Sequence, residues 1–373
     1  MKNRWSRGEK AIWMAPLLLG VLAAGIRFGP DLVRRGLNRP QQWHLAPDVK
    51  LDSLAVSRDG QVLVASGWAN VTGVKSMGSI HLLDVRSGEH RTIFAPTTEQ
   101  VVKDSVHSVH GLTLSPDGKS IGFSRVNQPW TIYDLATQKM RWRFTKDVWQ
   151  AQFSPDGRWI ALEGNDYVTV VAAENGNVRS RWKGHSPGPL AWSPDGTQVA
   201  SLNQFSSRPQ NGERDKTRVG FEVHRATDGK LLNRIEDEGT VGIAFSPDGR
   251  SLVVAANPRK LANRAKTEPL RCYSTSSGTL LWAVPAMKIS QQPGTHSNFV
   301  DVAFSPDGST VAAGQLSVGR ILLLDSSNGK VTRELWLDER DSIIAPLSPS
   351  LNFTSNGKWL FARGNNSVYA WDL

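Results

Sequence analysis

The chain has 373 residues, 39% of them hydrophobic and 21% charged, which excludes a disordered protein and a polytopic membrane protein. Its one cysteine, Cys272, excludes an internal disulfide, a CxxC redox pair and a cysteine-rich zinc site. A formal net charge of +10, spread over a folded surface, would favour nucleic acid or an anionic membrane as a partner. Residues 1–39 alone contribute +6, however, and the other 334 residues contribute only +4. We therefore expect no nucleic-acid partner.

The N-terminal charges flank an uncharged apolar run, residues 11–26 (AIWMAPLLLGVLAAGI). As a helix this run would be about 24 Å long, shorter than the ~30 Å hydrocarbon core of a bilayer unless flanking residues extend it. Residues 1–26 are therefore predicted to be either a cleaved signal peptide or an uncleaved membrane anchor. The lack of an Ala-x-Ala cleavage site favours the anchor. Residues 27–40 would form a basic linker that can lie against anionic headgroups.

Basic residues lie on both sides of the apolar run, so the positive-inside rule does not fix its orientation. We take the usual arrangement of an N-terminal signal sequence, with a cytoplasmic N-terminus and an exported body. The protein would then be membrane-anchored or secreted, with its folded part extracytoplasmic. The reverse orientation, with a cytoplasmic body, is the alternative.

The rest of the chain contains an internal repeat. The tetrapeptide Ser-Pro-Asp-Gly occurs at 115–118, 154–157, 193–196, 246–249 and 305–308, with degenerate copies at 57–60 and 354–357. In such a turn, proline presets the backbone, aspartate bonds back to the main chain and glycine eases the exit. We therefore interpret the aspartates as structural turn residues: Asp59, Asp117, Asp156, Asp195, Asp248 and Asp307.

Each copy of the turn lies between apolar residues, which predicts a hairpin. A third strand follows in every copy, for example at 79–85, 131–135 and 168–172, and a fourth follows in six of the seven. Four short antiparallel strands per roughly 40–50 residues predict the blade of a β-propeller.

The seventh copy lacks its fourth strand, which residues 41–47 (QQWHLAP) are predicted to supply. Closure of the ring in this way removes open sheet edges. We therefore expect an all-β fold with one domain over residues 41–373. This domain would be a seven-bladed β-propeller of four-stranded blades, preceded by one N-terminal apolar helix.

Residues 41–373 resemble the WD40-repeat family. The Ser-Pro-Asp-Gly turns match it, the Trp-Asp dipeptide is intact at 371–372 and the Gly-His dipeptide stands at 184–185. Weaker counterparts of Trp-Asp are Leu83-Asp84, Tyr133-Asp134 and Leu324-Asp325. The periplasmic TolB-like propellers are a more distant resemblance. Most of the family's polar network is absent, so packing that includes the 14 tryptophans is expected to stabilise the blades.

Length variation is predicted to be confined to one face of the propeller. The turns between strands 1 and 2 are uniform. Long segments are the 2–3 loops at 69–78, 204–217 and 257–268 and the blade connections at 97–108, 286–298 and 337–347. In a four-stranded blade these two kinds of segment lie on the same face. Because variable loops on a rigid scaffold usually carry recognition, this face is predicted to bind a protein partner.

Two of these loops, in adjacent blades, are basic. The candidate partner-binding residues are Arg208, Arg214, Arg259, Lys260, Arg264 and Lys266. They would form a site for an acidic partner, or else be ordinary solvated loop charge. His107, His185 and His296, each followed by serine, precede strand 1 of alternate blades, with His110 close behind. We interpret these histidines as structural caps and predict no metal site.

The sequence has no GxSxG elbow, P-loop or HExxH motif, so no catalytic residues are assigned. The favoured hypothesis is a non-catalytic, monomeric protein-binding scaffold without a cofactor, tethered to a membrane through residues 11–26. The alternative is an exported propeller enzyme, such as a lactonase-like hydrolase or a quinoprotein-like dehydrogenase. Its catalytic residues would converge on the central channel, so clustered carboxylates and histidines there would favour the enzyme.

Overall fold

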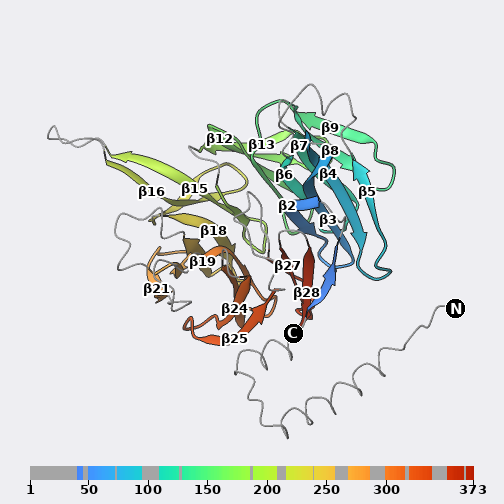
Figure 1. The fold of residues 1–373 in the computed structure, drawn as a ribbon. Coiled ribbons are helices and arrows are strands. Elements are labelled where there is room, and N and C mark those ends of the chain that lie inside the picture. Colours follow the sequence, from blue (N-terminus) through green and yellow to red (C-terminus); the bar gives the residue numbers. More distant parts are fainter. Residues whose placement is uncertain are drawn as a thin grey trace, which may run out of the picture. The chain divides into compact units, whose positions relative to one another are not determined.

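The repeated turns organise the chain into β-sheets (Figure 1). The structure, a computed structural model, describes residues 40–44, 49–71, 74–94, 109–125, 128–184, 188–207, 216–237, 239–256, 268–285, 299–315, 319–337, 351–364 and 367–373. These residues form 28 strands and no helix. The apolar run at 11–26 lies outside them.

Seven antiparallel sheets of four strands make the seven blades. Blades 1 to 3 contain β2 (Val49–Val56), β3 (Val62–Val71), β4 (Val74–Asp84) and β5 (His90–Phe94); β6 (Val109–Leu114), β7 (Ser120–Arg125), β8 (Trp130–Asp134) and β9 (Met140–Phe144); and β10 (Gln150–Phe153), β11 (Trp159–Glu163), β12 (Tyr167–Ala172) and β13 (Val178–Lys183).

Blades 4 to 6 contain β14 (Leu190–Trp192), β15 (Gln198–Ser207), β16 (Lys216–Arg225) and β17 (Leu231–Glu236); β18 (Thr240–Phe245), β19 (Ser251–Ala256), β20 (Leu270–Ser274) and β21 (Leu280–Val284); and β22 (Phe299–Phe304), β23 (Thr310–Gln315), β24 (Arg320–Asp325) and β25 (Val331–Trp336). Blade 7 contains β26 (Leu351–Phe353), β27 (Trp359–Arg363), β28 (Val368–Asp372) and, as its outer strand, β1 (Gln41–Trp43). The expected all-β, seven-bladed propeller of four-stranded blades is confirmed.

The turn between strands 1 and 2 has the same hydrogen bonds in each blade. In the first copy, the Ser57 hydroxyl donates to Asp59 Oδ1 at 2.6 Å, and the same oxygen accepts from the Gln61 N–H at 3.0 Å. The other five aspartates accept from the serine two residues before them and from the N–H two residues after them. In the last copy Thr354 and Asn356 make the same pair at 2.7 Å. Local chemistry thus fixes the start of every second strand.

The blades are joined by apolar clusters, one at each junction between neighbouring blades of the described chain. Tryptophans of the outer strands add hydrogen bonds across these junctions. Trp142 Nε1 donates to the Ala173 carbonyl at 3.0 Å, and Trp282 Nε1 donates to the Ser326 carbonyl at 2.8 Å. Since the innermost strands β2, β6, β10, β14, β18, β22 and β26 also meet in that order, the blades follow one another around a ring.

The ring closes between blades 7 and 1. β1 pairs antiparallel with β28, in the register Gln41↔Ala370 and Trp43↔Val368. The Gln42 amide donates to the Tyr369 hydroxyl at 3.0 Å, and Trp43 stacks on Phe361 with 6.3 Å between ring centroids. One blade is therefore built from segments more than 300 residues apart in sequence.

Two segments expected to be loops contain paired strand in the described residues. β3 and β4 stay paired as far as Val71↔Val74, so most of the loop predicted at 69–78 is hairpin. β15 and β16 likewise stay paired as far as Ser207↔Lys216 within the predicted loop 204–217. Extra residues between two paired strands can lengthen the ladder as well as the loop, because every added pair satisfies its own main-chain groups. β15 and β16 reach outward from the other strands (Figure 1).

Candidate functional site

The propeller has two faces that differ in their connections. We call the face with the 2–3 loops and blade connections the connection face, and the face with the 1–2 and 3–4 turns the turn face. The six basic candidate residues fall within 208–215 and 257–267, outside the described residues, as do His107, His185 and His296. The described part of the connection face includes the strand ends that flank these segments in sequence and the shorter turns of other blades.

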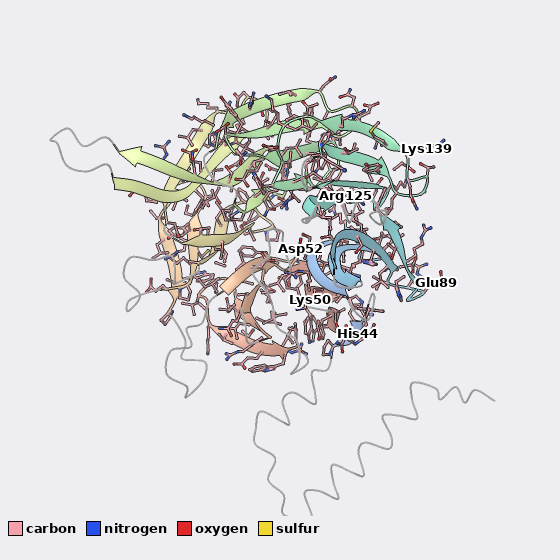
Figure 2. All side chains as sticks on the ribbon, turned by 45° about the horizontal axis from the view of Figure 1, so that its top comes forward. His44, Lys50, Asp52, Glu89, Arg125 and Lys139 are labelled. Atoms are coloured by element: carbon pink, nitrogen blue, oxygen red, sulfur yellow. The ribbon has the colours of Figure 1, made fainter. Side chains whose placement is uncertain are left out.

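On the inner side of the ring, residues of blades 7, 1 and 2 lie close together. Burial raises the pKa of the Asp52 carboxyl in β2, with Arg363 and His110 acting in the opposite direction. Burial also lowers the pKa of His110 in β6, which Asp52 partly offsets. Figure 2 shows Asp52 and Arg125 on the inner side of the ring, and Glu89 and Lys139 on its outer side. The environment thus disfavours the charged form of both Asp52 and His110.

His110 is the described member of the expected cap histidines. Its ring stands edge-on to Trp149, with centroids 4.9 Å apart and an interplanar angle of 71°. Its Nδ1 atom is buried and has no hydrogen-bond partner in the described structure. The ring contact links strand 1 of blade 2 to the start of blade 3.

Beside Trp149, the connection face is hollowed between blades 2 and 3. The hollow has a volume of about 160 Å³, and its polar lining includes Lys146, Asp147, Asn165, Asp166, Tyr167 and Arg181. Trp149 Nε1 donates to Asn165 Oδ1 at 2.7 Å, and Asn165 Nδ2 donates to Asp147 Oδ2 at 3.2 Å. These bonds hold the 2–3 turn of blade 3 against the connection from blade 2.

An arginine and a tyrosine form the exposed wall of this hollow. The Arg181 guanidinium lies over the Tyr167 ring, 3.5 Å from its centroid, and Tyr167 is 40% exposed. Stacking of this kind orients the guanidinium without using its N–H groups, which stay available for carboxylate or carbonyl oxygens of a partner. The hollow therefore offers an aromatic surface, cationic donors and carboxylates within one site.

In blade 4, a polar network holds the strands on either side of residues 208–215. The Glu222 carboxylate accepts from Asn203 at 2.6 Å, from His224 Nε2 at 3.0 Å and from Arg234 at 2.6 and 2.8 Å. Burial alone would raise the pKa of Glu222, but its hydrogen bonds from His224, Asn203 and Arg234 hold it below the ordinary value.

In blade 5, a second network follows residues 257–267. The buried Asp237 carboxylate accepts from Arg271 at 2.5 Å, from the Tyr273 hydroxyl at 2.6 Å and from Thr240 at 2.8 Å. Burial raises its pKa, against the pull of Arg271 and the hydroxyl donors. Both basic loops thus leave from strands fixed by buried carboxylates. These networks are not predictable from the motifs of the sequence, where their single local signal is the spacing of Glu222 and His224, two residues apart in one strand.

Two larger hollows lie on the turn face. One of about 260 Å³ lies between blades 1 and 2 and is lined by Asp84, Arg91 and Lys119, among others. The other, of about 490 Å³, lies between blades 6 and 7 beside Asp307 and Asn356. Both are bounded by turns of the fold, in which Asp84 and Asp307 already accept hydrogen bonds from main-chain N–H groups.

Side chains of the types that bind metals or act as nucleophiles are scattered over the described residues. In that part of the chain, no three His, Cys, Asp or Glu side chains are grouped so that they could hold a metal ion. Burial raises the pKa of the Cys272 thiol to about 12, so this residue is a packing residue and not a nucleophile. The same residues include no helix long and apolar enough to span a bilayer.

Comparisons with known proteins agree with the repeat. No family model matches the chain. Over 155 residues it is 24% identical to an uncharacterized WD repeat-containing protein of Synechocystis sp., a match that covers 40% of this chain and 41% of the relative. The chain is similar to WD-repeat proteins. The resemblance to these proteins predicted from the turns is thereby confirmed, although the chain spans less than half of the relative's length.

Solved structures confirm the fold of this WD-repeat-like propeller. A chain from the crystal structure of a mitotic checkpoint complex superposes with a TM-score of 0.65 and 13% identity, covering 90% of this chain and 92% of that one. A chain of Kuenenia stuttgartiensis hydrazine synthase superposes with a TM-score of 0.62 and 13% identity, covering 89% of this chain and 98% of that one. At such identities the likeness concerns the fold alone.

Proposed function

We propose that the protein is a non-catalytic scaffold, tethered to a membrane by residues 11–26, that recognises a protein partner on its connection face. The observation that carries this proposal is the hollow between blades 2 and 3, where Arg181 stacks on the exposed Tyr167 ring. Aromatic residues and arginine are enriched among residues that contribute most to protein–protein affinity. The similarity to WD-repeat proteins supports a binding role in preference to catalysis.

The basic loops would extend the same recognition surface. Arg259, Lys260, Arg264 and Lys266 in blade 5, with Arg208 and Arg214 in blade 4, would attract an acidic segment of the partner. The stacked Tyr167 and Arg181 would provide a rigid contact. Exposed charges chiefly raise the association rate, whereas desolvated aromatic contacts chiefly slow dissociation.

Affinity capture from solubilised membranes tests this function. The full chain is compared with a Tyr167→Ala, Arg181→Ala double variant and with a charge-reversed variant of the four blade 5 residues. We expect the partner captured by the full chain to be lost with the first and weakened with the second. Arg158→Ala is the matched control, because Arg158 is an exposed arginine of a structural turn on the opposite face. A captured set that is the same for every variant would refute the connection face as the binding site.

The structural similarity to hydrazine synthase does not support the alternative of a propeller enzyme, because this similarity concerns the fold alone. Asp52 and His110 lie on the inner side of the ring, and burial disfavours their charged forms. A substrate turned over by the purified chain and lost on Asp52→Asn would overturn the non-catalytic assignment.

A further inference from the structure

Exposed apolar side chains recur at one position of four consecutive blades. They are the first or first two residues of the outer strands β9, β13, β17 and β21: Met140, Val178, Leu231, Leu232, Leu280 and Leu281. Between 40% and 59% of each is exposed. Isolated exposed leucines are common, but the repetition of one position over blades 2 to 5 defines an apolar rim.

This apolar rim lies on the turn face. Every outer strand begins at the 3–4 turn and runs toward the connection face, so its first residues stand beside the turns. Farther along the same strands the apolar residues are buried, such as Trp182 in β13 and Ile235 in β17. Interblade packing therefore uses the later residues and leaves the first ones exposed. In blade 1 the corresponding residue is His90, which is polar.

The described chain also begins on the turn face. β1 is antiparallel to β28, with Gln41 opposite Ala370 and Trp43 opposite Val368. Because β28 ends at the turn face, Gln41 is the end of β1 nearer to that face. The described chain therefore enters the propeller, at Gln41, on the side that carries the apolar rim. β1 runs toward the connection face, and β2 begins at that face.

We infer that the turn face lies against the lipid bilayer and that the apolar rim inserts into its headgroup region. This inference rests on the proposed tether at residues 11–26. The linker at 27–40 spans at most about 50 Å when fully extended, so the tether keeps the face from which it leaves near the membrane. Exposed Lys139 and Lys230 directly precede Met140 and Leu231, so their ammonium groups can reach lipid phosphates while the apolar neighbours insert.

A lipid surface fits this rim better than a second protein does. The rim is a narrow row of one or two residues per blade along a curved edge, whereas a stable protein interface needs a broad, closely packed patch. The arrangement also has a consequence for the proposed function. With the turn face against the membrane, the connection face and its variable loops are presented away from it.

The test uses the full chain, reconstituted into vesicles of phosphatidylcholine with a minor fraction of phosphatidylglycerol. A polarity-sensitive fluorophore is attached at Leu281→Cys on the rim or, as the matched control, at Lys183→Cys where β13 ends on the connection face. Buried Cys272 provides the background, measured on the unmodified chain. We expect a blue shift and roughly twofold or greater quenching by headgroup-labelled lipid at position 281, and neither at position 183.

A second variant tests the rim itself. Leu231→Glu with Leu280→Glu should abolish the quenching of a label at Met140→Cys. Both leucines are about half exposed, so the variant is expected to keep the thermal midpoint of the parent.

The tether and the docking face can fail separately. If the chain does not float with the vesicles, the tether is wrong and the inference falls with it. If the chain floats but position 281 is not quenched, or position 183 is quenched equally, the tether stands and the docking face is wrong. Shielding of position 281 that grows with protein concentration in detergent, without lipid, would assign the rim to a second copy of the chain.

Discussion

Arg363 in the last blade donates its Nη1 to the main-chain carbonyl of Leu51 in the first blade, at 2.6 Å. Only 1% of Arg363 is exposed. The bond joins residues 312 apart in sequence, at the junction where β1 and β28 complete the seventh sheet. The buried guanidinium thus adds to the apolar cluster between blades 7 and 1 in closing the ring.

We expect Arg363→Ala to lower the free energy of unfolding by about 2–3 kcal/mol or more, because the Leu51 carbonyl loses a buried charged donor. Urea unfolding followed by tryptophan fluorescence measures the loss. Arg158→Ala is the control, since its ion pair with Asp156 is exposed and should be worth well under ~1 kcal/mol. Equal midpoints for the two variants would show that Arg363 does not support closure.

Gly329→Ala should be more destabilising than Gly88→Ala, by about 1–3 kcal/mol. Both glycines have a left-handed φ, of 72° and 73° respectively, so the backbone cost is shared. A Cβ at position 329 would lie 2.7 Å from the Trp282 ring, whereas nothing lies within 4 Å of a Cβ at position 88. Parallel thermal melts measure the difference, and its absence would mean that blades 5 and 6 are not tightly packed there.

Acid should weaken the fold through the repeated turns. Hydrogen bonds from Ser305 and from the Ser309 N–H hold the pKa of Asp307 below its ordinary value of 3.8, and Asp59 and Asp248 are shifted in the same direction by their turns. A carboxyl with a lowered pKa stabilises the fold above the unfolded value, and this contribution is lost as pH falls through the folded value. Stability should therefore drop below about pH 4.

Asp307→Asn should make this drop shallower and change the stability at pH 7 only slightly, because Asn356 already holds the seventh turn with the same contacts. Denaturant midpoints of the variant and the parent, measured at a series of pH values, check this prediction. If the variant lost stability with acid as steeply as the parent and was also much less stable at pH 7, the role given to the Asp307 carboxylate would be wrong.

The Glu163 carboxyl should give the opposite pH dependence, lowering the stability of the fold as pH rises. It is buried at the end of β11, its Oε2 accepts from the Gly188 N–H at 2.9 Å, and burial raises its pKa well above the ordinary 4.5. Stability is then highest below the unfolded value and falls as pH rises toward the folded one. Glu163→Gln keeps an acceptor for Gly188, so the variant should be more stable than the parent at pH 8 and equal to it near pH 4. Equal stability of the variant and the parent at pH 8 would refute the raised pKa of Glu163.

The propeller architecture could be predicted from the sequence because a repeated local turn fixes where the second strand of each blade begins. Six of the seven turns between strands 1 and 2 are completed by a serine and an aspartate two residues apart, as Ser57 and Asp59 show, and the seventh uses Thr354 and Asn356. The networks of Glu222 and Asp237 could not be predicted in this way, because their donors come from other strands and strand spacing does not reveal which side chains meet.

The loops show a second limit of the sequence pattern. Added length between two strands can extend the hairpin or the loop, and β3 with β4 shows the former where the latter was expected. The hollow at Tyr167 and Arg181 was likewise not anticipated. It depends on a register that places Thr169 opposite Arg181 and thereby sets the guanidinium beside the tyrosine ring. The basic loops and their partner stay predictions.

The pairing of β1 with β28 also sets the order of events in biosynthesis. Residues 41–43 leave the ribosome before every other described strand but find their partners at 368–370 only when nearly the whole propeller has been translated. The nascent chain must therefore carry an incomplete ring through most of translation, with the last blade open until the end. For the same reason, a circular permutant that joins these neighbouring segments and opens a turn elsewhere should still fold.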